Sequence, residues 1–188
     1  MRNILFIAYP LYADFEIAHT LFFLRKVGKV KVTTATVDGK HVESVGGLIT
    51  TPQIMLAEAK VEEYDLVLIS GGDGIKTIIN DSLLSEFLKD AHSKGTPIAT
   101  ICAAATLLGK AGLLKEKKFT CTENTFTHFN EVFEGAIYTG NNIEVLDNII
   151  TAKGTAFAEF TIAVGDQMKM WKNDAQSSDA LRFCKGEV

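Results

Sequence analysis

Cys102 is the residue of this chain best placed for covalent chemistry. It ends an apolar run at residues 96–101 and is followed at once by an alanine-rich segment, residues 103–112, that is typical of a helix. A side chain at such a strand-to-helix turn lies at the carboxyl edge of a parallel sheet, where the start of the helix favours negative charge. Because the thiolate is the reactive form of cysteine, we expect this position to activate the thiol. The alternative is a packing role, since free cysteines are commonly buried.

Three further segments bring polar groups or glycines to the ends of predicted strands. Residues 9–16 carry Glu16 into the start of a helix, residues 71–74 have the sequence Gly-Gly-Asp-Gly, and residues 153–155 have the sequence Lys-Gly-Thr. Ligands of open α/β sheets collect at the carboxyl ends of the strands, so we expect these segments to converge. The glycines allow backbone N–H groups to approach a ligand and form half of an oxyanion site, although tight turns use the same residues. We interpret the last segment as structural, with Thr155 as a helix N-cap.

The positions of these segments depend on an alternation of short apolar runs and longer helical patterns. Such alternation predicts an α/β fold with a mostly parallel sheet covered by helices on both faces. The predicted strands are residues 4–8, 30–37, 65–70, 96–101, 119–122 and one that ends at 153–154, and the predicted helices are residues 13–27, 53–60, 75–93 with a break near 81, 103–112 and 156–171. Residues 38–52 contain three glycines and predict a small β-hairpin, and a second hairpin is expected through residue 148.

Composition and charge narrow the class of protein. A chain of 188 residues that is 47% hydrophobic and 22% charged fits one globular domain, residues 1–188. The net charge of −4, with basic residues spread along the chain, gives no electrostatic footprint for nucleic acid or an anionic membrane. No segment approaches the ~18 apolar residues of a membrane span. We therefore expect a small-molecule substrate.

Cysteine usage predicts the cellular setting. Cys102, Cys121 and Cys184 are three in number and widely spaced, which argues against a disulfide framework and against a zinc site. This pattern favours a reducing, cytoplasmic location, and we expect neither a metal nor a cofactor. Cys121 is a candidate resolving thiol for an oxidised Cys102, but its place on a predicted strand favours burial.

In their order and spacing, these segments resemble the ThiJ/PfpI family of the class I glutamine amidotransferase-like superfamily. The resemblance covers nearly the whole chain and rests on residues 14–16, 70–73, 98–103 with 112–114, and 151–156 with 159–160. It implies a flavodoxin-like three-layer sandwich, commonly a homodimer. It also implies that Cys102 is a nucleophile at an elbow in a strained backbone conformation and that Glu16 approaches its thiol.

A carboxyl group beside a thiolate cannot easily stay ionised, because like charges in a poorly solvated site raise the pKa of one partner. We therefore expect a protonated Glu16 that donates a hydrogen bond to a Cys102 thiolate. The backbone N–H groups of Gly72 and Ala103 would then stabilise an oxyanion formed when sulfur attacks a carbonyl, an effect of about 3 kcal/mol for each donor.

One part of the family pattern is missing from this chain. Active hydrolases and glyoxalase-like members supply a histidine directly after the cysteine or on the strand that follows the elbow helix. Ala103 occupies the first position, and Thr122 or a neighbour occupies the second. His128 is the nearest substitute, although a surface or packing role is more common for a histidine. Asp73 either lines the pocket or completes a turn.

The leading hypothesis is a cysteine-dependent enzyme that acts on a small aldehyde, amide or ester through a covalent sulfur adduct, with glyoxalase-like and amidase or peptidase activities as the family precedents. The alternative is a redox-sensing or stress-response protein in which Cys102 is oxidised, a role that needs no general base. A third alternative is a non-catalytic binding module that keeps the elbow only as architecture.

Overall fold

The computed structural model describes residues 2–187, and at its centre is a seven-stranded sheet in the order β10-β11-β7-β6-β1-β2-β5. All neighbouring strands are parallel except β10 and β11, which form an antiparallel pair. The strands are β1 (Asn3–Ile7), β2 (Lys31–Thr36), β5 (Ile54–Met55), β6 (Leu66–Ile69), β7 (Ile98–Ile101), β10 (Ile143–Leu146) and β11 (Ile149–Ala152). Every residue of β6, β7 and β11 is buried, as expected for strands that are covered on both faces.

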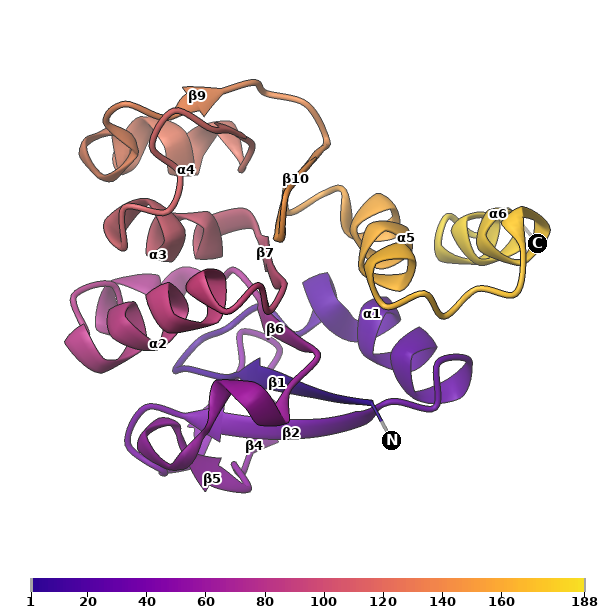
Figure 1. Ribbon diagram of the computed structural model, residues 1–188, viewed down its shortest axis with the longest axis horizontal. Helices are drawn as coiled ribbons and strands as arrows, with labels where there is room; N and C mark the ends of the chain where they lie inside the picture. Colours follow the sequence, from indigo (N-terminus) through magenta and orange to yellow (C-terminus); the bar gives the residue numbers. More distant parts are fainter. Residues whose placement is uncertain (1, 188) are drawn as a thin grey trace.

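Helices cover both faces of this sheet and form a three-layer sandwich (Figure 1). On one face lie α1 (Phe15–Lys26) and α5 (Phe157–Gln167), with α6 (Asp174–Cys184) packed outside α5. On the other face lie α2 (Ser82–Ser93) and α3 (Ala105–Lys110), with α4 (Glu123–His128) beyond α3. The predicted flavodoxin-like α/β fold is therefore confirmed. No helix within residues 2–187 combines the length and the apolar character needed to cross a bilayer.

Helix α2 shows how local sequence produces one of these layers. Its buried residues are Leu84, Phe87, Leu88 and Ala91, which follow the helical spacing of three or four and so form one apolar face. Asp81 is the N-cap, and its side chain accepts a hydrogen bond of 2.8 Å from the backbone N–H of Leu84. The predicted break near residue 81 is this cap, which follows a 3-10 turn at Asp73–Thr77.

Two small sheets lie outside the central one. The predicted hairpin at residues 38–52 is present as β3 (Val42–Glu43) paired antiparallel with β4 (Ile49–Thr50). The second small sheet pairs β8 (Lys118–Phe119) in parallel with β9 (Ile137–Tyr138). The side chains of Leu48 and Ile49 at the hairpin are 60% and 62% exposed. The homodimer that the family resemblance implies stays a prediction.

Two local predictions were wrong. Residues 53–60 do not form a helix, because Gln53 hydrogen bonds with both backbone groups of Thr34 and so draws the segment onto the sheet as β5, before a 3-10 turn at Leu56–Glu58. Thr155 is not the N-cap of the last long helix. Ala156 holds that position in α5, with no side-chain hydrogen bond to the helix start.

The strand order explains how distant segments meet at one edge. Four adjacent parallel strands, β11, β7, β6 and β1, end on the same side of the sheet. Shortly after these ends come Gly154, Cys102, Gly71 and the loop that leads to Glu16. The spacing of the strands therefore sets the spacing of these residues, and each connecting loop supplies only one or two side chains or backbone groups to the site.

Candidate active site

Cys102 lies at a strained turn between β7 and a 3-10 turn at Cys102–Ala104, which leads into α3. Its φ angle is +56°, in the left-handed region that residues with a side chain adopt at a cost of about 1–3 kcal/mol. The strained elbow that the resemblance implies is therefore present. Such strain persists only where the surrounding structure holds it, and here β7 and the small residues of the following turn do so.

Gly71 makes the close packing around this elbow possible. A Cβ atom on Gly71 would lie 2.6 Å from the Cβ of Cys102, 2.7 Å from Oε2 of Glu16 and 2.9 Å from the backbone nitrogen of Ala103. These distances are too short for any side chain, and two of the three contacts are with atoms that cannot move freely. The end of β6 must therefore be glycine for Glu16 and Cys102 to approach each other.

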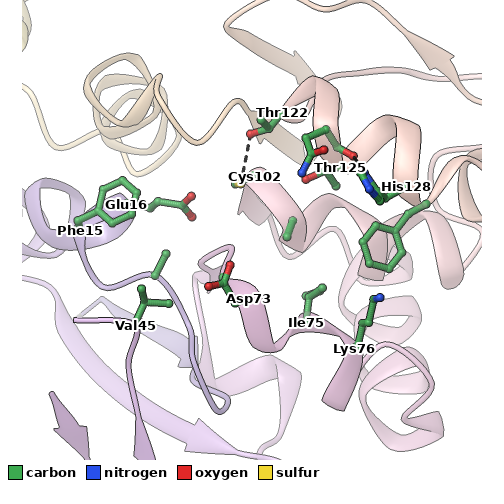
Figure 2. Close-up of a pocket in the computed structure, with 15 residues that line it drawn as sticks. Phe15, Glu16, Val45, Asp73, Ile75, Lys76, Cys102, Thr122, Thr125 and His128 are labelled. Carbon is green, nitrogen blue, oxygen red and sulfur yellow. Dashed lines mark hydrogen bonds between the residues drawn. The ribbon is translucent and has the colours of Figure 1, made fainter. Parts of the chain in front are cut away.

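Glu16 lies in the first turn of α1 and is only 3% exposed. Its Oε2 atom accepts a hydrogen bond of 2.7 Å from the backbone N–H of Gly71 and a weaker one of 3.4 Å from the hydroxyl of Ser70. The carboxyl group points toward Cys102 in Figure 2, and the two groups lie close enough to shift each other's pKa. The structure thus brings together the two residues that the sequence predicted as the catalytic pair.

Burial dominates the electrostatics of this pair. Burial raises the pKa of Glu16 from 4.5 to about 7. Burial, followed by the charge of Glu16, raises the pKa of the Cys102 thiol to about 11. Because the groups interact strongly, these values belong to the pair, which holds one proton, on the sulfur, and one negative charge between about pH 7 and pH 11.

The raised pKa of the thiol differs from the activation that the sequence predicted. We expected the helix after Cys102 to favour the thiolate, but a 3-10 turn intervenes and α3, Ala105–Lys110, is short. The N-terminal end of such a short helix compensates little of the cost of burial. The pKa of Glu16 is raised as expected but stays below that of the thiol, so the proton lies on the sulfur, the reverse of the predicted thiolate beside a protonated Glu16.

Thr122 occupies the place beside the sulfur where the family pattern has a histidine. Its hydroxyl donates a hydrogen bond of 3.2 Å to Sγ of Cys102 and accepts one of 3.2 Å from the backbone N–H of Gly154. Because the Gly154 N–H occupies the hydroxyl oxygen, the hydroxyl proton is directed at the sulfur. Thr122 therefore orients the sulfur but does not titrate.

A cavity of about 380 Å³ opens in front of the sulfur. Gly72 and Ala103, the predicted oxyanion donors, both line it, and the backbone N–H of Ala103 is hydrogen-bonded to Cys102. The accessory candidates Asp73 and His128 line it as well, but Nδ1 of His128 lies 2.8 Å from the carbonyl oxygen of Asn124 and not against the sulfur. The roles of these residues stay predictions.

Sequence reasoning missed two residues of the site. It treated Gly154 as structural, yet a Cβ there would lie 2.7 Å from Oε1 of Glu16 and 3.0 Å from Sγ of Cys102. It also placed the ligand-facing N–H at Gly72, whereas the N–H of Gly71 is the one that holds Glu16. The available signal was a glycine directly after each of two buried parallel strands, where a ligand or another backbone comes close.

The other two cysteines do not face the cavity. Cys121 is fully buried, and burial raises its pKa to about 12. Cys184 lies on α6 and is also buried. All three cysteines are free. Within residues 2–187, no three side chains of the metal-binding types His, Cys, Asp and Glu come together.

The raised pKa of Glu16 predicts a specific dependence of stability on pH. Between pH 4.5 and about 7 the folded protein binds more protons than the unfolded chain, so this contribution to the free energy of unfolding falls as pH rises. In the unmodified protein we expect this contribution to lower the free energy of unfolding by about 3 kcal/mol over that pH range, at about 1.4 kcal/mol for each pKa unit. Glu16→Gln should not show this decrease. Urea unfolding at pH 5 and pH 8 measures it. The control is Glu86→Gln on the exposed side of α2, and equal pH dependence in all three proteins would contradict the assignment.

Comparisons with known proteins agree with this geometry. The sequence profile of the DJ-1/PfpI family matches residues 2–167. The chain is 33% identical over 173 residues to Protein DJ-1alpha of Drosophila melanogaster, which covers 89% of this chain and 77% of that protein. It is 29% identical over 145 residues to the glutathione-independent glyoxalase DJR-1.2 of Caenorhabditis elegans, which covers 76% of this chain and 75% of that protein.

A solved structure shares the fold over the full length. A DJ-1 superfamily protein from Agrobacterium tumefaciens superposes with a TM-score of 0.88, covers 100% of both chains and is 24% identical. At this identity the likeness shows the fold alone, while the family profile covers residues 2–167 and so includes both Glu16 and Cys102. This chain belongs to the DJ-1/PfpI family.

Proposed function

We propose that this protein is a cysteine-dependent enzyme of small-molecule carbonyl chemistry. The observation that carries the proposal is the buried pair of Cys102 and Glu16, which shares one proton at the floor of a cavity of about 380 Å³. A carboxyl group with a pKa near 7 is suited to move a proton at neutral pH, because it is protonated and deprotonated with little cost. Glu16 thereby supplies the function that histidine supplies in other members of the family.

The proposed reaction begins with attack by the sulfur on an electrophilic carbonyl carbon. The S–C bond forms and the π bond of the carbonyl breaks, while the S–H bond breaks and the thiol proton passes to the Glu16 carboxylate. Backbone N–H groups of Gly72 and Ala103 hold the developing oxyanion, and Glu16 then gives its proton to that oxygen. The product of this step is a neutral tetrahedral adduct on Cys102. Its formation needs no oxidant, metal or second thiol.

Two features favour small substrates. The cavity volume of about 380 Å³ lies at the small end of the range for small-molecule sites, and its walls include the apolar side chains of Phe15, Val45 and Ile75. The relative from Caenorhabditis elegans is named a glutathione-independent glyoxalase. A 2-oxoaldehyde is therefore the first substrate class to test.

Conversion of methylglyoxal to lactate, followed by an enzymatic lactate assay, tests this proposal. We expect turnover by the unmodified protein, its loss in Cys102→Ser, and a fall of about 100-fold or more in Glu16→Gln, since proton transfer typically contributes at least that much. Cys184→Ser is the matched control, because it removes a thiol that lies outside the cavity. Turnover that survives Cys102→Ser, or that Glu16→Gln leaves unchanged, would contradict the proposal.

A second candidate function is oxidation of Cys102 as a redox signal. The specific observation in its favour is Thr122, whose hydroxyl donates to the sulfur at the place of the missing histidine and stabilises negative charge without acting as a base. Oxidation by peroxide adds oxygen to sulfur, and the peroxide leaves as water for each oxygen added.

Intact-mass measurement after graded peroxide separates the two candidates. A redox role predicts that Cys102 alone gains two oxygens while the fold is retained, with no lactate formed from methylglyoxal. Rapid gain of oxygen at Cys121 or Cys184 as well would show unfolding or general damage and would contradict that role, because both residues are buried.

A further inference from the structure

We propose that the outer end of the active-site cavity recognises a carboxylate on the substrate, through Lys76. This inference rests on the proposed function for the reacting carbonyl and adds the chemical class of the substrate: a small carbonyl compound that carries a carboxylate a few bonds away from the electrophilic carbon. Figure 2 shows Lys76 and His128 on the side of the cavity opposite Glu16, with Cys102 between the two ends.

Lys76 is held at the cavity rim. It belongs to the 3-10 turn Asp73–Thr77, which the buried residues Gly74 and Ile75 fix against the body of the protein. Its ammonium nitrogen lies 5.8 Å from the centre of the Phe129 ring, an arrangement that attracts a cation to the ring face. Both residues line the cavity. The ring thus keeps the positive charge at the rim of the cavity.

The ion pairs of the described residues leave the charge of Lys76 uncompensated. Six ion pairs connect side chains within residues 2–187, and none includes Lys76. Asp73 is only three residues away on the same turn, yet its carboxylate points toward Cys102 in Figure 2. An anion from a ligand is therefore the natural partner for this ammonium group.

His128 adds a second polar group at the same end. Its Nδ1 atom lies 2.8 Å from the carbonyl oxygen of Asn124, one turn earlier in α4, so that nitrogen carries the hydrogen of the bond. The other ring nitrogen, Nε2, has no hydrogen in the neutral ring and can only accept a hydrogen bond, so the charge that attracts an anion at this end comes from Lys76. Asn124 and Thr125 also line this part of the cavity and supply polar groups beside the ring.

The distribution of charge along the cavity sets the orientation of the substrate. Glu16 and Asp73 make the inner part unfavourable for an anion, because like charges repel. A carboxylate is therefore disfavoured beside the sulfur and attracted to the rim. The neutral carbonyl of the same molecule then lies against Cys102. One lysine suits a single carboxylate.

Matched thiol reagents test this inference without any turnover. The probes are 3-maleimidopropionate and its amide, which share shape and reactive group but differ in the charge of a group several bonds from the reactive carbon. The measured quantity is the ratio of their rates of reaction with Cys102, divided by the same ratio for free glutathione. We expect a ratio above one that falls as salt is added.

Substitutions test whether Lys76 causes the preference for the carboxylate probe over its amide. Lys76→Gln should lower the ratio about threefold or more, and Lys76→Arg should keep it, because the charge remains. Lys89→Gln on the exposed side of α2 is the matched control, since it removes the same charge away from the cavity. A ratio that Lys76→Gln leaves unchanged, or that Lys89→Gln lowers equally, overturns this inference alone. Failure of both reagents to modify Cys102 overturns the proposed function as well.

Discussion

The site depends on one constraint: a carboxyl group and a thiol are buried against each other at the edge of a parallel sheet. Water would stabilise the charge of either group, but Glu16 is 3% exposed and Cys102 only partly exposed. The pair therefore cannot carry two negative charges at neutral pH, and it keeps one proton. A proton held so close to the sulfur is available to any oxyanion that the sulfur creates. The chemistry proposed for this protein follows from that single fact.

The rest of the structure serves to hold this unfavourable arrangement. The left-handed backbone of Cys102 and the burial of Glu16 both cost free energy, and neighbouring groups offset part of it by hydrogen bonds from Gly71 and Thr122. The fully buried strands β6 and β7 provide the rigid base on which these contacts stay in register. The buried strands of the sheet thus contribute stability, while the strained backbone of Cys102 and the buried carboxyl group of Glu16 lie at the carboxyl edge of the sheet.

The sequence predicted the sheet and the meeting of Cys102 with Glu16 because these follow from simple patterns. Buried parallel strands are continuous apolar runs, and their carboxyl ends share one edge, so the order of segments already places the site. The role of Gly154 was not predictable in this way. It depends on how closely β11 and β7 approach, and a single sequence shows a glycine there without showing what it touches.

Electrostatics and edge structure were the least predictable features. The sequence shows that a helix follows Cys102, but not that a 3-10 turn comes first and weakens the effect of that helix on the thiol. In the same way, Gln53 converts a helical pattern into the edge strand β5 through hydrogen bonds to a strand far away in sequence. Both outcomes are set by tertiary contacts that override local propensity.

The pKa of Glu16 in the folded protein is the most direct test of the central claim, and carbon-13 NMR of the side-chain carboxyl measures it residue by residue. Glu159, whose pKa is lowered by its ion pair with Lys185, serves as an internal reference in the same spectra. The account predicts that Glu16 titrates near pH 7, while the reference titrates in the acidic range. A Glu16 carboxyl that titrates near its ordinary value of 4.5 would contradict the account, because burial beside Cys102 would then not raise its pKa and Glu16 would be too weak a base to exchange a proton with the thiol at neutral pH.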